Sequence, residues 1–291
     1  MPELPEVETI ARVLAKRVTG ERIESVWIGG KPEPLKSPAA DIVKALEGAR
    51  IAGVRRVGKH LVVDLDSCDG GRATSPARRK PRRQPLEDER PQARAQWIVH
   101  LGMTGSMLVA HPGDAIARHT HLIARLASGR EIRFVDPRRF GRLAIVRDQF
   151  AAPGKEPLHV DRESFAALFR GRKTPIKSAL LNQKLLSGIG NIYADESLAR
   201  AGIRPRRRAA ALTRAQLERL YGTVQQVLLE AIAAGGSSVS DYVDADGEPG
   251  FFQFQHRVYG REGEPCLVCR TPIKRVVIAG RSSHYCPKCQ K

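Results

Sequence analysis

The chain has 291 residues, and 49 Lys and Arg against 31 Asp and Glu give it a formal net charge of +18. Its hydrophobic share of 42% excludes a wholly disordered chain, and no apolar run approaches the ~18 residues that a membrane span needs. The length suggests two domains of about 150 residues each. The positive excess favours a polyanionic partner, with nucleic acid ahead of a membrane surface. Because no signal pattern of basic and then apolar residues follows Met1, we expect a cytoplasmic protein with no membrane partner.

The N-terminal half begins with a predicted helix and continues with short strands. Residues 5–18 form an amphipathic pattern whose apolar positions share one face, and Gly20 follows as a stop signal. Between residues 22 and 148 the pattern changes to short β runs, namely 61–65, 97–99, 121–126 and 131–135, with a hairpin turn at 127–129. Many short strands without alternating helices predict an antiparallel β-sandwich or barrel.

One stretch interrupts these strands. Residues 68–96 contain four Pro, eight basic and four acidic residues, with almost nothing to bury. This composition predicts a disordered basic insertion between two strands. The fifth cysteine of the chain, Cys68, lies in it and has no predicted role.

The second half has a helical period. Thr174-Pro175 is a good start for a helix through about residue 184, a Gly-containing break follows at 187–190, and the helical pattern resumes over 191–201. A capping box at 213–216 starts a long helix that ends at Gly235-Gly236. A basic run at 204–208 is interpreted as a solvated surface. We therefore expect a β domain at 1–150, a helical domain at 151–250 and a small tail at 251–291.

The tail holds four of the five cysteines. Cys266 and Cys269 form one CxxC pair, and Cys286 and Cys289 form another after sixteen residues. This is the spacing of a four-cysteine zinc site, and so short a tail needs a metal to hold it together. Two disulfides are disfavoured in the cytosol, and thiol redox chemistry would need only one pair. Because four thiolates leave no open position, we expect one structural Zn²⁺ without catalytic function.

The N-terminus offers nucleophilic chemistry. Met1 is normally removed before a small residue such as Pro2, which would then carry a free secondary amine that is substantially neutral at cellular pH. Such an amine can attack a sugar carbon at the aldehyde level and form an iminium ion that acts as an electron sink. Glu3 and Glu6 lie beside it and could move protons. The same residues are also ordinary helix-start chemistry, with Pro at the first position and Glu in the first turn.

Six motifs in order connect this chain to a known family. Residues 2–8 (PELPEVE) resemble the N-terminal signature of the formamidopyrimidine-DNA glycosylases. The other motifs of that family follow in the same order: 58–60 (GKH), 100–105 (HLGMTG), 136–141 (DPRRFG), 188–193 (GIGNIY) and the four-cysteine tail. The resemblance covers nearly the whole chain except residues 68–96, which the family pattern does not require. It implies a multidomain α+β fold: an N-terminal antiparallel β-sandwich with an N-terminal helix, a helix–two-turn–helix domain and a C-terminal four-cysteine zinc-finger β-hairpin.

The resemblance also implies catalytic roles. The Schiff-base nucleophile of the family falls on Pro2, its proton donor on Glu3 and a supporting carboxylate on Glu6. The hairpin lysine assigned to β-elimination matches Lys59. The zinc-hairpin arginine linked to δ-elimination matches Arg281, which we interpret as a phosphate clamp because an arginine is a poor proton donor at neutral pH.

Further positions match DNA-contacting residues of the family. The three residues that fill the gap left by an extruded base match Met103, Arg138 and Phe140, and Asn191 falls at the turn between two helices where it can hold phosphate. His119, Arg172 and Lys177 match other DNA contacts. Residues 237–254 correspond to the loop that covers the extruded base.

The resemblance implies a repair activity on damaged double-stranded DNA. The leading hypothesis is a bifunctional glycosylase and abasic-site lyase for oxidised purines, acting as a monomer. One alternative is an oxidised-pyrimidine glycosylase of the endonuclease VIII type, which shares the proline, glutamate and zinc plan. The other is a zinc-finger DNA-binding protein without catalysis, against which the presence of Pro2, Glu3 and Lys59 counts.

Overall fold

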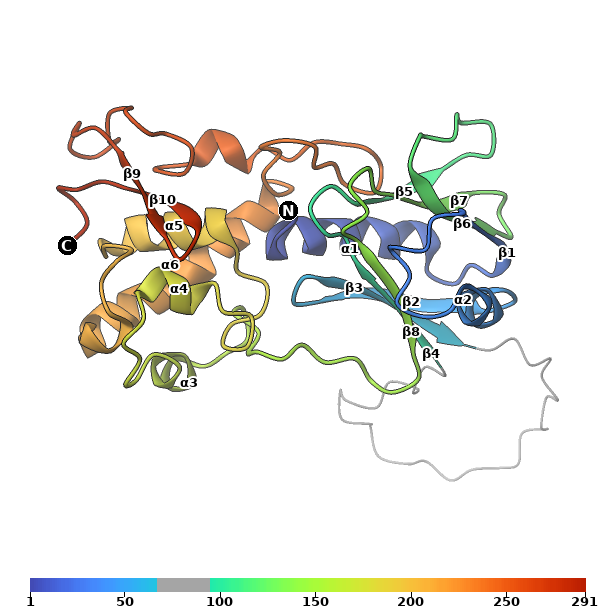
Figure 1. The fold of residues 1–291 in the computed structure, drawn as a ribbon, viewed down its shortest axis with the longest axis horizontal. Coiled ribbons are helices and arrows are strands. Elements are labelled where there is room, and N and C mark those ends of the chain that lie inside the picture. The colour runs from blue at the N-terminus through green and yellow to red at the C-terminus, as the bar shows by residue number, and fades with distance from the viewer. Residues whose placement is uncertain (67–94) are drawn as a thin grey trace, which may run out of the picture.

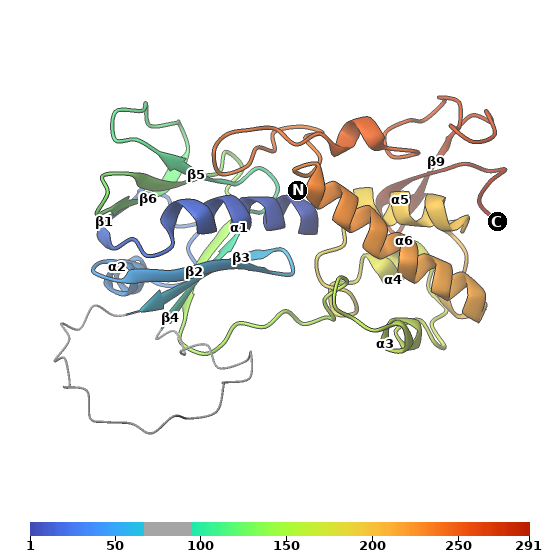
Figure 2. The same ribbon diagram turned by 180° about the vertical axis from the view of Figure 1, so that it is seen from behind.

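The computed structural model describes residues 1–66 and 95–291. The protein has a β-rich half and a helical half, and its N-terminus lies between them (Figures 1 and 2). The C-terminal hairpin packs on the helical half. This arrangement brings the first residues of the chain into contact with residues that follow almost two hundred positions later.

Two four-stranded antiparallel sheets form the β-rich half, with strand orders β1-β6-β7-β5 and β2-β3-β4-β8. Their inward side chains form a single apolar cluster, which confirms the predicted sandwich. The predicted runs and the hairpin at 127–129 all lie in this half. The strands are β1 (Ile23–Ile28), β2 (Arg50–Val57), β3 (His60–Asp66), β4 (Ala95–His100), β5 (Ser106–Ala110), β6 (Thr120–Leu126), β7 (Glu131–Val135) and β8 (Arg142–Val146).

Helix α1 (Leu4–Val18) belongs to both halves of the molecule. Its predicted apolar stripe packs into the sandwich cluster together with α2 (Ala39–Leu46), whereas Leu4 packs into the core of the helical half. The Leu4 amide donates to the carbonyl of Gly188 at 3.0 Å. The first turn of α1 is therefore fixed from both sides.

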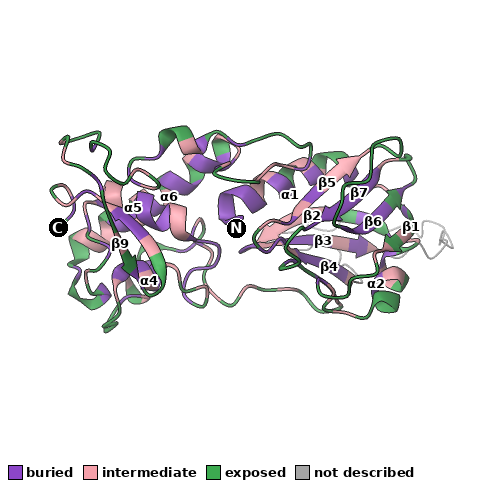
Figure 3. Cartoon of the chain, turned by 45° about the horizontal axis from the view of Figure 1, so that its top comes forward, coloured by how far each residue is buried: buried purple, intermediate pink, exposed green. Residues whose placement is uncertain are grey.

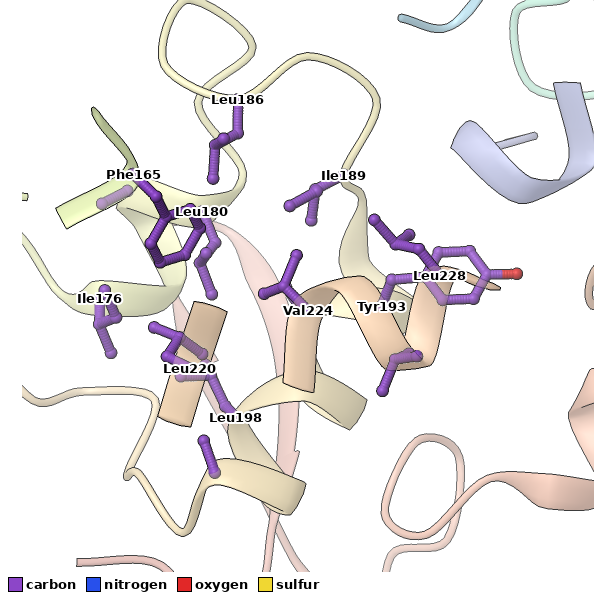
Figure 4. Close-up of a cluster of buried hydrophobic side chains, with 14 of the residues drawn as sticks. Phe165, Ile176, Leu180, Leu186, Ile189, Tyr193, Leu198, Leu220, Val224 and Leu228 are labelled. Carbon is purple, nitrogen blue, oxygen red and sulfur yellow. The ribbon is translucent and has the colours of Figure 1, made fainter. Parts of the chain in front are cut away.

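The helical half consists of α3 (Arg162–Ala167), α4 (Ile176–Leu180), α5 (Asn191–Ala201), a 3₁₀ turn (Ala209–Ala211) and α6 (Arg214–Ala233). Leucine, valine and isoleucine side chains form most of one core in this half (Figure 4). Tyr193 lies at one edge of this core, and its hydroxyl points away from it. Helix α6 begins at the predicted capping box, where Thr213 and Gln216 exchange side-chain and backbone hydrogen bonds of 3.0 and 3.3 Å.

The predicted helix over 174–184 is wrong in its extent. Helix α4 covers only Ile176–Leu180, and a turn follows. The side-chain oxygen of Asn182 accepts from the amide of Lys184 at 3.0 Å, and the Gln183 amide donates to the carbonyls of Leu181 and Ile189. These local hydrogen bonds give the backbone an alternative to helical hydrogen bonds. The spacing of apolar residues does not indicate them.

The C-terminal tail is a 3₁₀ turn (Phe252–Gln255) followed by the hairpin β9 (Lys274–Ile278) and β10 (Arg281–Tyr285). A buried carboxylate on α5 anchors it: Glu196 accepts the backbone amides of Arg257, Val258 and Tyr259, each at 2.9 Å. Three charge-assisted hydrogen bonds to one carboxylate offset the cost of burying its charge.

The arginines of the basic run at 204–208 are exposed or half-buried, as the composition predicts, and two of them also bind the tail. Arg204 donates to the carbonyls of Gln290 and Pro287, both at 2.9 Å, and Arg206 donates to the carbonyl of Val277 at 3.3 Å. These guanidinium groups join the helical half to the tail, because each can donate several hydrogen bonds in a fixed fork.

Only the last two residues of the predicted insertion, 95 and 96, lie in the described part of the chain. Residues 68–94 of the insertion lie outside that part. Ala95 and Gln96, which the composition also assigned to it, belong to strand β4, where Gln96 pairs with Val146 and is buried. In the described ranges, no helix is long and apolar enough to cross a membrane.

Candidate active site and DNA-binding surface

The first turn of α1 lies between the two halves and is buried (Figure 3), and it contains the buried Glu6. One of its carboxylate oxygens accepts the amide of Ser237 at 2.8 Å and the hydroxyl of Tyr193 in a short hydrogen bond. The other accepts the amide of Glu3 at 2.8 Å. Burial raises the pKa of Glu6, and it raises the pKa of Tyr193 well above its usual range. Glu6 therefore binds three segments of the chain together.

Glu3 has an unusual environment. One oxygen accepts the amide of Ile192 at 3.2 Å, and the other is buried without a hydrogen-bond partner among the described residues. Burial raises the pKa of Glu3 to about 7, against the opposing charge of Lys59. Its carboxyl group packs on Gly190, where an added Cβ would lie 2.1 Å from the carboxyl carbon. Position 190 therefore accepts no larger residue without displacing Glu3. The raised pKa makes the Glu3 carboxyl group a candidate proton donor near neutral pH.

The N-terminal amine and Lys59 complete the group. Pro2 is buried beside the two carboxyl groups, and burial lowers the pKa of the α-amine at Met1. Lys59 sits in the β2–β3 turn after Gly58, whose φ of +60° favours glycine. Burial also lowers the pKa of Lys59, although Glu3 and Glu6 oppose this effect. The structure thus brings Pro2, Glu3, Glu6 and Lys59 together.

The tip of the C-terminal hairpin faces this group. Arg281 is exposed at the start of β10. Burial lowers the pKa of both Lys59 and Lys177, and the positive charge of Arg281 lowers it further. Next to it, Ser282 receives a hydrogen bond from the side-chain amide of Asn191 at 3.3 Å. Arg281 and Asn191 therefore lie near the N-terminal helix, although they come from different segments.

Lys177 is not at the surface. Its side chain is 0% exposed, and its ammonium binds Asp195 at 2.7 Å and the carbonyl of Ser282 at 2.6 Å. Asp195 in turn accepts the amide of His284 at 2.9 Å. The expectation of a direct DNA contact does not fit this conformation. Lys177 instead holds the hairpin strand that carries Arg281.

Met103, Arg138 and Phe140 lie on two adjoining loops. Met103 is 42% and Phe140 is 53% exposed, and the Arg138 guanidinium lies 5.0 Å from the centre of the Phe140 ring. The buried carboxylate of Asp136 joins the loops, accepting the hydroxyl of Thr104 and the amide of Gly141, both at 2.7 Å. Exposed apolar side chains on so well-anchored loops are available to a partner.

A small cavity of about 50 Å³ lies between these loops and the N-terminus. Pro2, Glu6, Met103 and Thr104 line one side, and residues 237 and 239–242 close the other. The Tyr242 hydroxyl donates to the carbonyl of Gly235 at 3.0 Å. Residues 237–242 therefore cover the space beside the N-terminal amine.

His119 and Arg172 lie apart from this group, and both are exposed. His119 precedes β6, with a φ of +70° and a carbonyl that accepts the amide of Asp136 at 3.0 Å. Arg172 follows α3 and donates to the carbonyl of Leu168.

Four residues of the site have no role predicted from the sequence, namely Tyr193, Ser237, Asp195 and Asp136. The motifs at 136–141 and 188–193 contain Asp136 and Tyr193 and could have indicated them.

The four cysteines form a metal-binding cluster. Their sulfur atoms all lie within 4.8 Å of one another, with Cys266–Cys289 at 3.9 Å and Cys269–Cys286 at 3.4 Å. A tetrahedral zinc ion with Zn–S bonds of about 2.3 Å places its sulfur ligands about 3.8 Å apart. The donor set fits one structural Zn²⁺.

Comparison with known families covers the chain in three consecutive matches. Residues 1–143 match the formamidopyrimidine-DNA glycosylase N-terminal domain, and residues 153–243 match the formamidopyrimidine-DNA glycosylase H2TH domain. Residues 263–291 match the zinc finger found in FPG and IleRS.

Comparison with individual proteins gives full-length relatives. A protein of Solibacter usitatus named formamidopyrimidine-DNA glycosylase is 42% identical over 100% of both chains. The Lactococcus lactis Fpg in complex with DNA containing N7-benzyl-Fapy-dG has a TM-score of 0.84 and 31% identity, over 100% of both chains. The same enzyme in complex with abasic-site DNA has a TM-score of 0.84 and 30% identity, over 99% of each chain. The family matches in domain order and the relatives that align over their full length agree: the chain belongs to the formamidopyrimidine-DNA glycosylase family.

Proposed function

We propose that this protein is a base-excision repair enzyme that removes oxidised purines, including 8-oxoguanine and formamidopyrimidines, from duplex DNA and then cuts the abasic strand. The observation that carries the proposal is the buried group formed by Pro2, Glu3, Glu6 and Lys59 beside exposed residues suited to DNA. Family membership and the DNA-bound Lactococcus lactis relatives support it.

Pro2 is the nucleophile after removal of Met1. The lone pair of its secondary amine forms a bond to C1′ of the damaged nucleoside, the electron pair of the glycosidic bond leaves with the base, and the N–H proton of the amine passes to the departing base. The sugar ring then opens at the C1′–O4′ bond, which yields an iminium ion between Pro2 and C1′. A secondary amine suits this step because its iminium cannot lose its charge by deprotonation at nitrogen.

Glu3 supplies the proton for the leaving oxygen. One of its oxygens has no hydrogen-bond partner among the described residues and can bond O4′, and a pKa of about 7 leaves the carboxyl group protonated in part of the population at neutral pH. Glu6 keeps the first turn in place through Ser237 and Tyr193. Glu3 is thus the proton donor and Glu6 its support.

Strand cleavage follows from the iminium. Withdrawal of electrons toward nitrogen acidifies the C2′ protons, and loss of one expels the 3′ phosphate by β-elimination. A second elimination, through the conjugated product, expels the 5′ phosphate. Lys59 transfers a proton and contributes positive charge during the β-elimination. Arg281 binds the phosphate during the second elimination. Asn191 and Arg172 bind the DNA backbone, as does His119 on the other half, while Lys177 acts through the hairpin.

Access to the lesion requires a bent duplex with the nucleotide turned out of the stack. Met103 and Phe140 are the wedges, and Arg138 donates to the orphaned base. Because the cavity beside Pro2 is only about 50 Å³, residues 237–242 must move outward to admit the base and then cover it.

Secondary points of the proposal concern organisation. We place domain boundaries at 1–150, 151–250 and 251–291, with one structural Zn²⁺ in the last unit and a monomer as the active species. The bacterial relatives support a location in the bacterial cytoplasm, at the nucleoid.

Substrate comparison tests the proposal. We expect the protein to cut duplexes containing 8-oxoguanine or a formamidopyrimidine at least about tenfold faster than a duplex containing thymine glycol, in single-turnover assays resolved on denaturing gels. Preference for thymine glycol would favour the endonuclease VIII alternative. Tight binding to abasic-site duplex with no cleavage of any substrate would favour a DNA-binding protein without catalysis.

The raised pKa of Glu3 predicts a pH profile. Since the protonated carboxyl group is the donor, kcat/KM should fall as pH rises through about 7. The change Glu3→Gln should lower the excision rate by ~10²–10⁴, the usual contribution of a general acid, and remove this alkaline decline. The matched control Glu24→Gln, at an exposed position of β1, should retain both rate and profile. An alkaline decline that persists in Glu3→Gln would assign it to another group.

A further inference from the structure

A second cavity, of about 360 Å³, opens on the β-rich half away from the catalytic group. It lies at the junction of three segments: the end of β1, the start of β6 and the turn after β7. Its lining is Trp27, Gly29, Gly30, Lys31, His119, Thr120, His121, Pro137 and Arg139. This volume falls within the ~300–1,000 Å³ of small-molecule sites.

The aromatic wall of this cavity is Trp27. Trp27 is 51% exposed. It lies in β1, where it pairs with Ile123 of β6. A Cβ added at Gly29 would lie 3.3 Å from the far edge of the indole ring, so the absence of a side chain there lets the ring fold over the backbone. An exposed, supported indole is a stacking platform that accepts any planar base.

The rim is basic. Lys31, His119 and Arg139 surround the opening, and all three are exposed. Arg139 is paired with an acidic group, Glu33, which accepts from it at 2.6 Å. Because both partners of this pair are about half exposed, the pair is weak, and a phosphate can compete for the guanidinium. An aromatic wall with cations at its mouth is complementary to a nucleotide.

The cavity and the candidate DNA-binding surface share one turn of the chain. In the turn at 136–141, Pro137 and Arg139 line the cavity, whereas Arg138 and Phe140 pair outside it. His119, a predicted backbone contact, belongs to the rim. Because the lining residues Pro137 and Arg139 alternate along the chain with Arg138 and Phe140, DNA held by Arg138 and Phe140 lies near the cavity.

We propose that this cavity, the Trp27 pocket, binds an unpaired nucleotide of the DNA under repair, with the base stacked on Trp27 and the phosphate at Lys31 and Arg139. A paired base has both faces covered by its neighbours, so only an extrahelical or single-stranded nucleotide can enter. The pocket gives the enzyme a preference for lesions next to a bulge or a single-stranded tail. The inference rests on the proposed function for the path of the DNA.

Intrinsic fluorescence tests the pocket without catalysis. The chain has two tryptophans, and Trp97 is 0% exposed, so quenching by a solute reports on Trp27. We expect dAMP to quench the emission saturably, and Lys31→Ala to weaken the apparent affinity several-fold. Quenching by inorganic phosphate to the same extent would overturn the stacking role, as would unsaturable quenching by dAMP.

Lesion duplexes with one unpaired adenine, placed at successive positions on either side of the lesion, test the preference. Stacking contributes ~1–3 kcal/mol per base, so binding at the favoured position should be about fivefold to 150-fold tighter than to a fully paired duplex. Trp27→Ala should abolish this gain, and Trp27→Phe should retain most of it. Both variants should cut the fully paired lesion duplex at the wild-type rate.

The outcomes separate the two proposals. Wild-type protein that binds dAMP and the bulged duplex but excises no base would overturn the proposed function and leave the pocket supported. A bulge preference that survives Trp27→Ala, or no preference at any position, would overturn the pocket and leave the excision chemistry untouched. Unchanged thermal unfolding of Trp27→Phe is the control for folding.

Discussion

Blocking the amine of Pro2 is expected to abolish covalent capture of DNA. Protein that retains Met1 has this nitrogen in a peptide bond, and an amide nitrogen does not form an iminium. In protein with Met1 removed, Pro2→Gly should lower trapping and excision by about a hundredfold or more, because glycine leaves a mobile primary amine where a rigid secondary amine is required. The measurement is borohydride trapping on a duplex with a single 8-oxoguanine or abasic site, followed on denaturing gels.

The controls separate chemistry from folding. Pro112→Gly, in an exposed loop before β6, should trap DNA as well as the parent chain. Abasic duplex should bind Pro2→Gly with little loss, since the DNA-contacting residues are intact. If Pro2→Gly or the Met1-retaining protein forms the adduct at the parental rate, the nucleophile is another group.

Removal of zinc is expected to abolish DNA binding. The tail has a small apolar cluster around Val258, Ile273 and two of the cysteines, which is too little to hold it folded without the metal. Loss of the ion should release the hairpin and with it Arg281 and the Ser282 carbonyl that binds Lys177. Metal content and duplex affinity, measured on the same chelated sample, test this expectation.

Two variants sharpen the zinc experiment. Cys269→Ser, which removes one ligand, should reproduce the loss, whereas Lys288→Ala, at a non-ligand position between Cys286 and Cys289, should retain zinc and most of the affinity. Readdition of zinc to the chelated protein should restore binding. Full affinity in protein shown to be free of metal would contradict the structural role of the tail.

The fold was largely predictable because its signals are local. The stripe of α1, the capping box of α6 and the hairpin at 127–129 each depend on residues within a few positions of one another, and all three are confirmed. The CxxC pairs likewise predicted a four-sulfur cluster. The end of α4 was missed because Asn182 and Gln183 compete for the backbone through side-chain hydrogen bonds, which periodicity does not describe.

The contacts of the site were less predictable because they are distant in the sequence. The hydrogen bond between Ser237 and Glu6 joins positions 231 residues apart, and no pattern in either segment indicates it. A motif match likewise gives the type of residue and not its burial. Lys177 matched a DNA contact and proved to be enclosed with Asp195. Arg204 is exposed, as predicted, but it also binds the tail, which the composition of the run does not indicate.

The junction at the first turn of α1 also orders events during synthesis. Residues 1–8 leave the ribosome first, but the partner of Glu3 is Ile192, 189 residues later, and the partner of Glu6 comes later still. Until those segments emerge and dock, both carboxyl groups are hydrated and have ordinary acidity. On the proposed assignment, the nascent chain therefore carries the nucleophilic amine before the carboxyl group that protonates the sugar is buried. On the proposed mechanism, the catalytic geometry forms only when two parts of the chain that are synthesised at different times close on one turn of α1.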